Sequence, residues 1–291
     1  MNLDYDTLMG MAPIVMEQGY TCRESCIYAL GVGCGVEPAD DWMRQFLAPL
    51  PPARTLPTMA TVLAAPRVHA MGLGLTMPGV LHGGQSLVSH AALPAEGHLR
   101  SETRIAEIFD RGEGRGCQVN MIRELRDAQT GTHYATLEQS LICRLDQVAG
   151  APPADKPVPL AADGAPPDVI VAASSSTQAA QIFSLTGDQN PLHLVPEVAA
   201  KAGFAGPILH GMATYGLCAA FAEKALCAGD GKWPGHRLGA ISGKFSAPVF
   251  PGETIEIAIW HEPAGARIEA RVPARDKVVF GDGRIAIAEA N

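Results

Sequence analysis

A run of prolines and alanines near the middle of the chain most constrains what it can fold into. Residues 150–167 read GAPPADKPVPLAADGAPP, with no hydrophobic periodicity. Prolines keep such a segment semi-extended, which is typical of a linker between folded units. The chain has 291 residues, whereas a usual domain has about 100–150. We therefore predict an N-terminal domain over residues 1–150, a linker over 151–168 and a C-terminal domain over 169–291.

Short matches between the two halves indicate an old duplication. Residues 28–31 (YALG) align with 183–186 (FSLT), and Gly97 aligns with Gly252, in both cases at a shift of 155. The Leu-His-Gly element at 81–83 echoes the one at 209–211, but at a shift of 128. Each match is short, yet their order is the same in both halves, which favours duplication over chance.

The second half combines one helical segment with several strand-like runs. The Ala-rich, largely apolar stretch after Gly211 is long enough for a buried helix. Runs with strand character cover 239–245, 254–261, 267–272 and 278–287, and in the first half 98–109, 116–127 and 132–145. A long helix followed by antiparallel strands implies an α+β fold in which a sheet wraps around a helix. Residues 71–84 of the first half contain five glycines and one proline, so we expect the central helix there to be shortened.

Composition excludes several classes of protein. The net charge is −8, and no cluster of Lys and Arg suggests a nucleic-acid partner. We expect no secretory signal in the first residues and no membrane span, because no apolar run is long enough to cross a bilayer. The seven cysteines are odd in number and lack a C-x-x-C pair. This favours reduced thiols and a cytoplasmic location over a disulfide framework or a zinc site.

The loop 187–193 (GDQNPLH) gathers groups suited to proton transfer. Asp, Asn, Gly and Pro are also ordinary turn formers, so a plain turn is the alternative. However, a carboxylate and an imidazole can together bind a water molecule, take a proton from it and return one. The downstream element 207–211 (PILHG) predicts a helix start. A backbone N–H there, at Gly211, could stabilise an oxyanion.

These two elements, together with residues 245–252 (FSAPVFPG), resemble the MaoC-like or hydratase-2 family. In the first half, residues 28–33 and 81–85 look like the N-terminal half of its double-hotdog members. The resemblance implies a double hotdog of two antiparallel sheets, each wrapped around a central helix, and (R)-specific 2-enoyl-CoA hydratase activity. One departure is Gly84, where we expect Glu in many members.

The resemblance also implies roles for individual residues. Asp188 and His193 would form the catalytic pair, Asn190 would lie in the same water-binding cluster, and Gly211 would supply the oxyanion donor. The residues expected along the path of the substrate and its CoA are His82, Gly83, Arg111, Gln189, Pro191, Leu192, Gly211 and Phe245. Lys244 is a further candidate for a phosphate contact. For the side chains of His82 and His210 we favour structural roles. No metal or organic cofactor is expected, since CoA is part of the substrate.

The first half lacks a second catalytic set. At the shift of 155, the positions of Asp188, Asn190 and His193 fall on Gly33, Gly35 and Pro38, which cannot do acid–base chemistry. We therefore expect the N-terminal domain to widen the acyl pocket and complete the CoA tunnel. Its shortened helix would leave room for a long or bulky acyl chain.

The sequence thus predicts reversible hydration of trans-2-enoyl-CoA to (3R)-3-hydroxyacyl-CoA by a homodimer. One alternative is a hydratase or dehydratase of branched or dicarboxylic enoyl-CoA, such as mesaconyl-CoA. Others are a non-catalytic acyl-CoA-binding subunit and a hotdog thioesterase. The intact set of Asp188, Asn190 and His193 argues against a pure binding subunit, which needs no paired acid and base.

Overall fold

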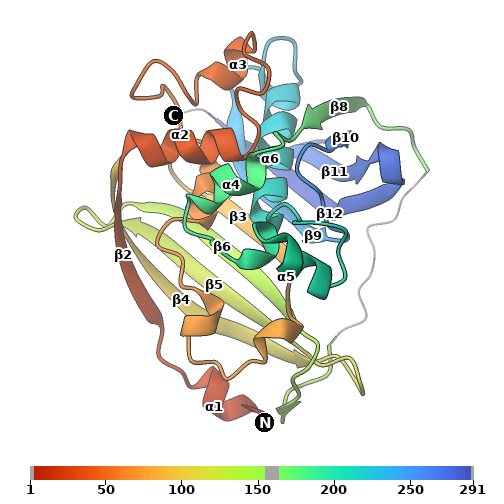
Figure 1. The fold of residues 1–291 in the computed structure, drawn as a ribbon. Coiled ribbons are helices and arrows are strands. Elements are labelled where there is room, and N and C mark those ends of the chain that lie inside the picture. Colours follow the sequence, from red (N-terminus) through yellow and green to blue (C-terminus); the bar gives the residue numbers. More distant parts are fainter. Residues whose placement is uncertain (1–2, 155–163, 290–291) are drawn as a thin grey trace.

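One antiparallel sheet of ten strands organises the protein. The structure is a computed structural model that describes residues 3–154 and 164–289. The strand order is β2-β4-β5-β6-β3-β9-β12-β11-β10-β8 (Figure 1). The first half supplies β2 (Ile14–Tyr20), β3 (Val80–Ser89), β4 (Gly97–Asp110), β5 (Cys117–Asp127) and β6 (His133–Cys143). The second half supplies β8 (Val169–Ser174), β9 (Arg237–Phe245), β10 (Thr254–Glu262), β11 (Gly265–Val272) and β12 (Lys277–Ala288).

The strand order reads the same from both edges, as a duplication requires. From the outside inwards it is 2-4-5-6-3 in one half and 8-10-11-12-9 in the other. The two sheets expected from the sequence meet edge to edge through β3 and β9, where Gly84 lies opposite Lys244. All seven strands predicted from the sequence are present within two residues of their expected bounds. The domain division stays a prediction, because residues 155–163 of the expected linker lie outside the described residues.

The predicted central helix of the second half is confirmed as α6 (Gly211–Cys227). It is largely apolar, with Glu223 and Lys224 as its charged residues, and such a helix is stable only when buried. Twelve of its 17 residues are buried. The Tyr215 hydroxyl donates to the carbonyl oxygen of Ile241 on β9 at 2.8 Å, which ties the helix to the sheet. The start of α6 is thereby fixed near the centre of the molecule.

Residues 3–154 contain no such helix, and the location expected for it in the first half was wrong. In the range 71–84, residues from Val80 onwards belong to β3, and only a short 3₁₀ turn, η3 (Met77–Gly79), precedes them. Glycines and a proline disfavour a helix there. Residues 56–64 fill the space instead: Leu56, Met59, Ala60, Leu63 and Ala64 are at most 2% exposed. The room predicted for an acyl chain is therefore occupied by this segment.

A buried arginine anchors that segment. Arg123 on β5 donates to the carbonyl oxygens of Ala60, Thr61 and Leu63. These carbonyls lie at the end of η1 (Pro57–Thr61), where a 3₁₀ helix leaves acceptors unpaired. A cation is favoured at the carboxyl end of a helix. Arg123 thus stabilises a loop in the place that a helix occupies in the other half.

The Leu-His-Gly echo between the halves was also misinterpreted. Residues 81–83 lie within strand β3, whereas 209–211 lead into helix α6. The counterpart of β3 in the mirrored strand order is β9. This explains why that one match has a shift of 128 when the other two have 155.

The remaining helices are short (Figure 1). They are α1 (Tyr5–Met9), α2 (Cys22–Gly31), α3 (Asp41–Arg44), α4 (Ala179–Ser184), α5 (Pro196–Lys201) and the 3₁₀ turns η2 (Val68–Ala70), η4 (Pro191–His193) and η5 (Pro273–Arg275). Two short strands, β1 (Leu3–Asp4) and β7 (Val148–Ala149), pair in parallel. Within the described ranges, no helix is long and apolar enough to cross a membrane.

Candidate active site

Asx side chains build the loop that follows α4. The chain turns at Gly187 with a φ of +119°, which favours glycine. The carboxylate of Asp188 accepts from the backbone N–H of Asn190 at 3.1 Å, and the amide oxygen of Asn190 accepts from the N–H of Leu192 at 3.1 Å. The second bond caps η4, which presents His193. The turn-forming role of these residues is therefore real, and Asp188 itself remains exposed.

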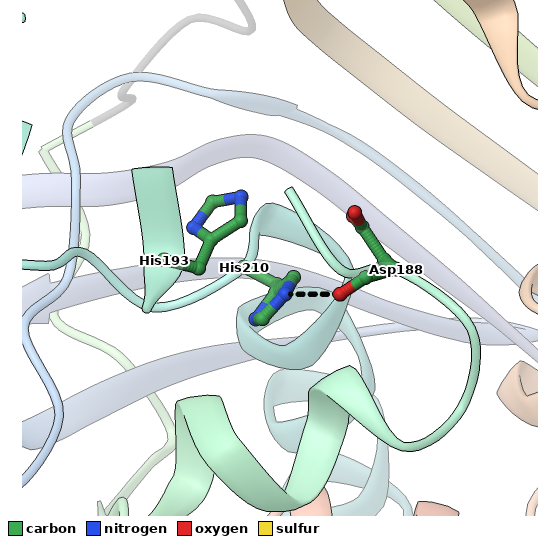
Figure 2. A group of neighbouring side chains, drawn as sticks. All are labelled: Asp188, His193 and His210. Atoms are coloured by element: carbon green, nitrogen blue, oxygen red, sulfur yellow. Dashed lines mark hydrogen bonds between the residues drawn. The ribbon is translucent and has the colours of Figure 1, made fainter. Parts of the chain in front are cut away.

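His193 is held as a neutral base. Its side chain is buried, and its Nδ1 lies 2.8 Å from the carbonyl oxygen of Ile208. A carbonyl only accepts, so Nδ1 carries the proton and Nε2 keeps a free lone pair. Burial lowers the pKa of His193, while the bond to Ile208 and the charge of Asp188 oppose this. Figure 2 shows its ring beside the exposed carboxylate of Asp188.

His210 joins this cluster directly. It precedes α6, is 1% exposed, and its Nε2 lies 3.0 Å from the backbone oxygen of Asp188. Its ring stacks on that of His193, with centroids 3.9 Å apart and an interplanar angle of 29°. Burial lowers the pKa of His210 to about 4, and neighbouring His193 adds to the effect. The structural role favoured from the sequence is thus a role within the site (Figure 2).

The cluster has the composition of a metal site but not the geometry. Donor atoms of Asp188, His193 and His210 all lie within 4.8 Å of one another. Nitrogen lone pairs lie in the plane of an imidazole ring, so two stacked rings do not converge on a single ion. Each ring also has one nitrogen engaged with a backbone carbonyl oxygen. The arrangement therefore suits proton transfer better than metal binding.

A wall beside the loop comes from three other elements. Gly211 is the first residue of α6, and its N–H has no hydrogen-bond partner in the described part of the chain. The ring of Phe245, at the end of β9, lies 3.6 Å from where a Cβ on Gly211 would be. The ring of His82 on β3 meets Phe245 edge-on, with centroids 5.0 Å apart. Burial lowers the pKa of His82 to about 4, and Asp188 is close enough to oppose that shift.

Other expected contact residues fall in different places. Gln189 and Pro191 are exposed in the loop, and Leu192 is half-buried there. Gly83 lies in β3 beside a bulge, packed against Ile142.

The two expected phosphate ligands already have partners. Arg111 lies in the turn after β4, and its Nη1 donates to the carbonyl oxygen of Arg115 at 2.9 Å. No contact described for it reaches the loop. The Nζ of Lys244 pairs with Asp282 at 2.7 Å. At Gly84, a Cβ would lie 3.2 Å from the backbone oxygen of Gly243, so the glycine fits the close pairing of β3 and β9.

Sequence reasoning missed one residue altogether. The Nη2 of Arg67, from the first half, donates to the carbonyl oxygen of Gly187 at 3.2 Å. The two residues are 120 positions apart, and nothing in the local pattern around Arg67 marks it. Only the fold brings it to the loop.

Comparison with known proteins places the chain in a family. Residues 19–144 match the MFE-2 hydratase 2 N-terminal domain, and residues 151–279 match the MaoC like domain. The chain is 33% identical over 280 residues to 3-hydroxyacyl-thioester dehydratase Y of Mycobacterium tuberculosis, covering 94% of each chain. It is 32% identical over 294 residues to Enoyl-CoA hydratase ChsH3 of the same organism, covering 97% of this chain and 98% of the relative.

A solved structure agrees with the sequence relatives. The MaoC-like dehydratase from Phytophthora capsici superposes with a TM-score of 0.82 at 25% identity, covering 98% of this chain and 99% of that one. The double-hotdog arrangement expected from the sequence is confirmed. The chain therefore belongs to the MaoC-like, hydratase-2 family of hydro-lyases.

Proposed function

We propose that the protein catalyses reversible hydration of trans-2-enoyl-CoA to (3R)-3-hydroxyacyl-CoA. The observation that carries this is the state of His193. Its Nδ1–H is committed to Ile208, which leaves Nε2 free to accept a proton next to the carboxylate of Asp188. The names of the mycobacterial relatives, a 3-hydroxyacyl-thioester dehydratase and an enoyl-CoA hydratase, describe the two directions of such a reaction.

The chemistry needs a base, a proton donor and a stabilised oxyanion. A water molecule held by Asp188, Asn190 and His193 gives up a proton to the pair of Asp188 and His193. At the same time its oxygen bonds to C3 of the substrate. The electron pair of the double bond moves towards the thioester carbonyl, whose oxygen becomes negative. Asp188 and His193 then return the proton to C2, so that H and OH from one water molecule add across the bond. Each acid–base group is typically worth about 10²–10⁴ in rate.

Gly211 is suited to the oxyanion. Its N–H is the first of a 17-residue helix and has no partner among the described residues. Unpaired donors at a helix start, together with the helix dipole, favour negative charge. Phe245 and His82 line the same corner and would border the thioester and pantetheine. An acyl-CoA is thus the proposed partner, and a homodimer the proposed assembly.

Free thiols support a reducing compartment for this activity. All seven cysteines are unpaired, and five are buried. We therefore extend the proposal to a cytoplasmic protein that acts without a metal or organic cofactor.

A spectroscopic assay with crotonyl-CoA and longer 2-enoyl-CoAs tests the function. Hydration removes the conjugated absorbance without releasing a thiol, whereas a thioesterase releases free CoA. Chiral analysis of the product should give the 3R isomer. Thiol release, or a 3S product, would contradict the proposal.

Variants of the pair test the assignment of the site. Asp188→Asn and His193→Ala should each lower kcat by about 10²–10⁴. Asp168→Asn, at an exposed carboxylate bonded to the N–H of His261, is a matched control and should retain wild-type rates. If both loop variants keep near-wild-type rates, the site is elsewhere.

A further inference from the structure

Two side chains from outside the loop hold consecutive carbonyls of the candidate catalytic loop. Nη2 of Arg67 donates to Gly187 O at 3.2 Å, and Nε2 of His210 donates to Asp188 O at 3.0 Å. One comes from the first half of the chain and the other from the start of α6. Within the described part of the chain, the side chain of Asp188 makes only a local hydrogen bond, to the N–H of Asn190. The position of its carboxylate therefore depends on how its backbone is held.

His210 is a rigid donor. It is 1% exposed and lies between two rings, with centroids 3.9 Å from His193 and 5.0 Å from Phe183. Its Nε2–H therefore has a fixed direction towards Asp188. The same ring contacts the proposed base and holds the backbone of its partner, so both groups share one support (Figure 2).

The other nitrogen of His210 destabilises the folded protein. Its Nδ1 is buried and has no hydrogen-bond partner among the described residues. An unsatisfied buried acceptor costs about 1–3 kcal/mol. A phenyl ring would stack equally well without that cost. A histidine here is hence explained by its Nε2–H and not by packing.

Arg67 acts from the opposite side. It is exposed, and in residues 3–154 and 164–289 no carboxylate pairs with it. Among those residues, its side chain makes one hydrogen bond, the bond to Gly187. The donor belongs to the half in which Gly33 and Pro38 fall at the positions of Asp188 and His193. This contact gives that half a direct mechanical connection to the loop.

We propose that His210 and Arg67 are positioning residues that fix Asp188 relative to His193 by holding the carbonyls of residues 187 and 188. The inference rests on the proposed function, because it assigns the two residues to the same acid–base site. A misplacement of about 1 Å can cost about 10²-fold in rate. Loss of either donor should therefore act on kcat and leave substrate binding intact.

The first experiment distinguishes the effect of the Nε2–H donor of His210 from the effect of its stacked ring. His210→Phe keeps the stack and removes the donor, while His210→Gln restores an N–H near the Nε2 position. We expect His210→Phe to lower kcat by about 10- to 100-fold, with KM within twofold of wild type and an equal or higher Tm. His210→Gln should recover part of kcat. Unchanged kcat in His210→Phe, or a lower Tm that accounts for its loss, would overturn the role of His210.

The second experiment addresses Arg67. Arg67→Met removes the donor but keeps an unbranched, largely apolar stem, and Arg67→Lys can still donate to a carbonyl. Arg67→Met should lower kcat several-fold, and Arg67→Lys should restore most of it. Arg104→Met, an exposed arginine on β4, loses the same charge and should match wild type. A rise in KM alone would make Arg67 a substrate contact and overturn the positioning role.

Hydrogen exchange separates this inference from the proposed reaction. Amides of residues 188–195 should exchange faster in His210→Phe and Arg67→Met than in wild type, without any substrate present. If no enoyl-CoA is hydrated by the wild type, the proposed function fails while the exchange result still decides the positioning role. Unchanged exchange in both variants would overturn it.

Discussion

Tyr28 and Phe183 contact each other across the two halves, with ring centroids 5.9 Å apart at 53°. They are the residues that the internal repeat aligns, so equivalent positions of α2 and α4 meet. Phe183 in turn contacts His210, and His210 stacks on His193. A continuous column of four rings therefore connects the first half of the chain to the candidate catalytic histidine.

Substituting Gly31 should disturb this contact between helices. A Cβ on Gly31 would lie 3.2 Å from Cα of Phe183, which is a backbone atom and cannot turn away. Gly31→Ala should force α2 and α4 apart and cost about 1–3 kcal/mol in the free energy of unfolding. Gly19→Ala is the matched control, because its Cβ would meet only Gly97 O, at 4.0 Å. Urea unfolding of the two variants measures the difference, and equal stabilities would contradict the close approach.

The sequence predicts the strands well because alternation is a local property. Residues 255–260, for example, alternate between buried and half-buried positions along β10, and that pattern is visible in the residue types. Of the longer strands that the sequence missed, β3 contains paired glycines and a bulge, and β2 and β8 lie at the two edges of the sheet. Their assignment needs the partner strand.

In the candidate site, too, some residues can be predicted from a local motif and others only from the fold. Asp188, Asn190 and His193 lie within six consecutive residues, so one motif reveals them. The contribution of His210 depends on a stack and that of Arg67 on a contact across 120 positions, and neither has a local pattern. The filled space over residues 56–64 depends on Arg123, whose three acceptors lie 60–63 positions away.

Removing the N–H of Gly211 tests the oxyanion donor without changing a side chain that binds substrate. Proline is tolerated at the first helical position, and the residue before it must be extended. His210 meets this requirement with φ −57° and ψ 137°. We expect Gly211→Pro to lower kcat by about 10²–10³ while Tm stays near wild type.

Gly211→Ala is the control for that variant. It keeps the N–H, and its Cβ would make an ordinary contact of 3.6 Å with the Phe245 ring. Steady-state kinetics with crotonyl-CoA should show the large loss only in the proline variant. Comparable kcat values in the two variants would remove Gly211 from the mechanism.

The ion pair between Arg54 and Glu223 should respond unequally to removal of either partner. Nη2 of Arg54 lies 2.6 Å from Oε1 of Glu223, whose side chain is fully buried, whereas Arg54 is 31% exposed. Arg54→Met leaves a buried carboxylate uncompensated, which costs about 3–5 kcal/mol. Glu223→Gln should cost less, because the amide oxygen can still accept from the N–H of Leu238 and Arg54 can reach water. Chemical unfolding of both variants checks the order, and a larger loss for Glu223→Gln would refute it.

Acid should weaken both activity and stability, through different histidines. Burial lowers the pKa of His193 below its ordinary value of 6.5, and the proposed base works in its neutral form. Activity should therefore hold at neutral pH and decline as pH falls below that pKa. A pH profile of kcat/KM measures this limb, and a profile that rises towards acid would contradict a neutral base.

His210 is one of the buried histidines through which stability should depend on pH. Its pKa is about 4 in the folded protein, against an ordinary value of 6.5. Between these values the unfolded chain binds a proton that the folded protein excludes, so the stabilisation present above pH 6.5 is lost as pH falls towards 4. The loss is at most about 1.4 kcal/mol per pH unit for one histidine. His210→Phe and His210→Gln both remove this titration. In urea unfolding at pH 5 and pH 7, each should show a smaller stability difference than wild type, and an undiminished difference in both would mean that His210 is not the group responsible.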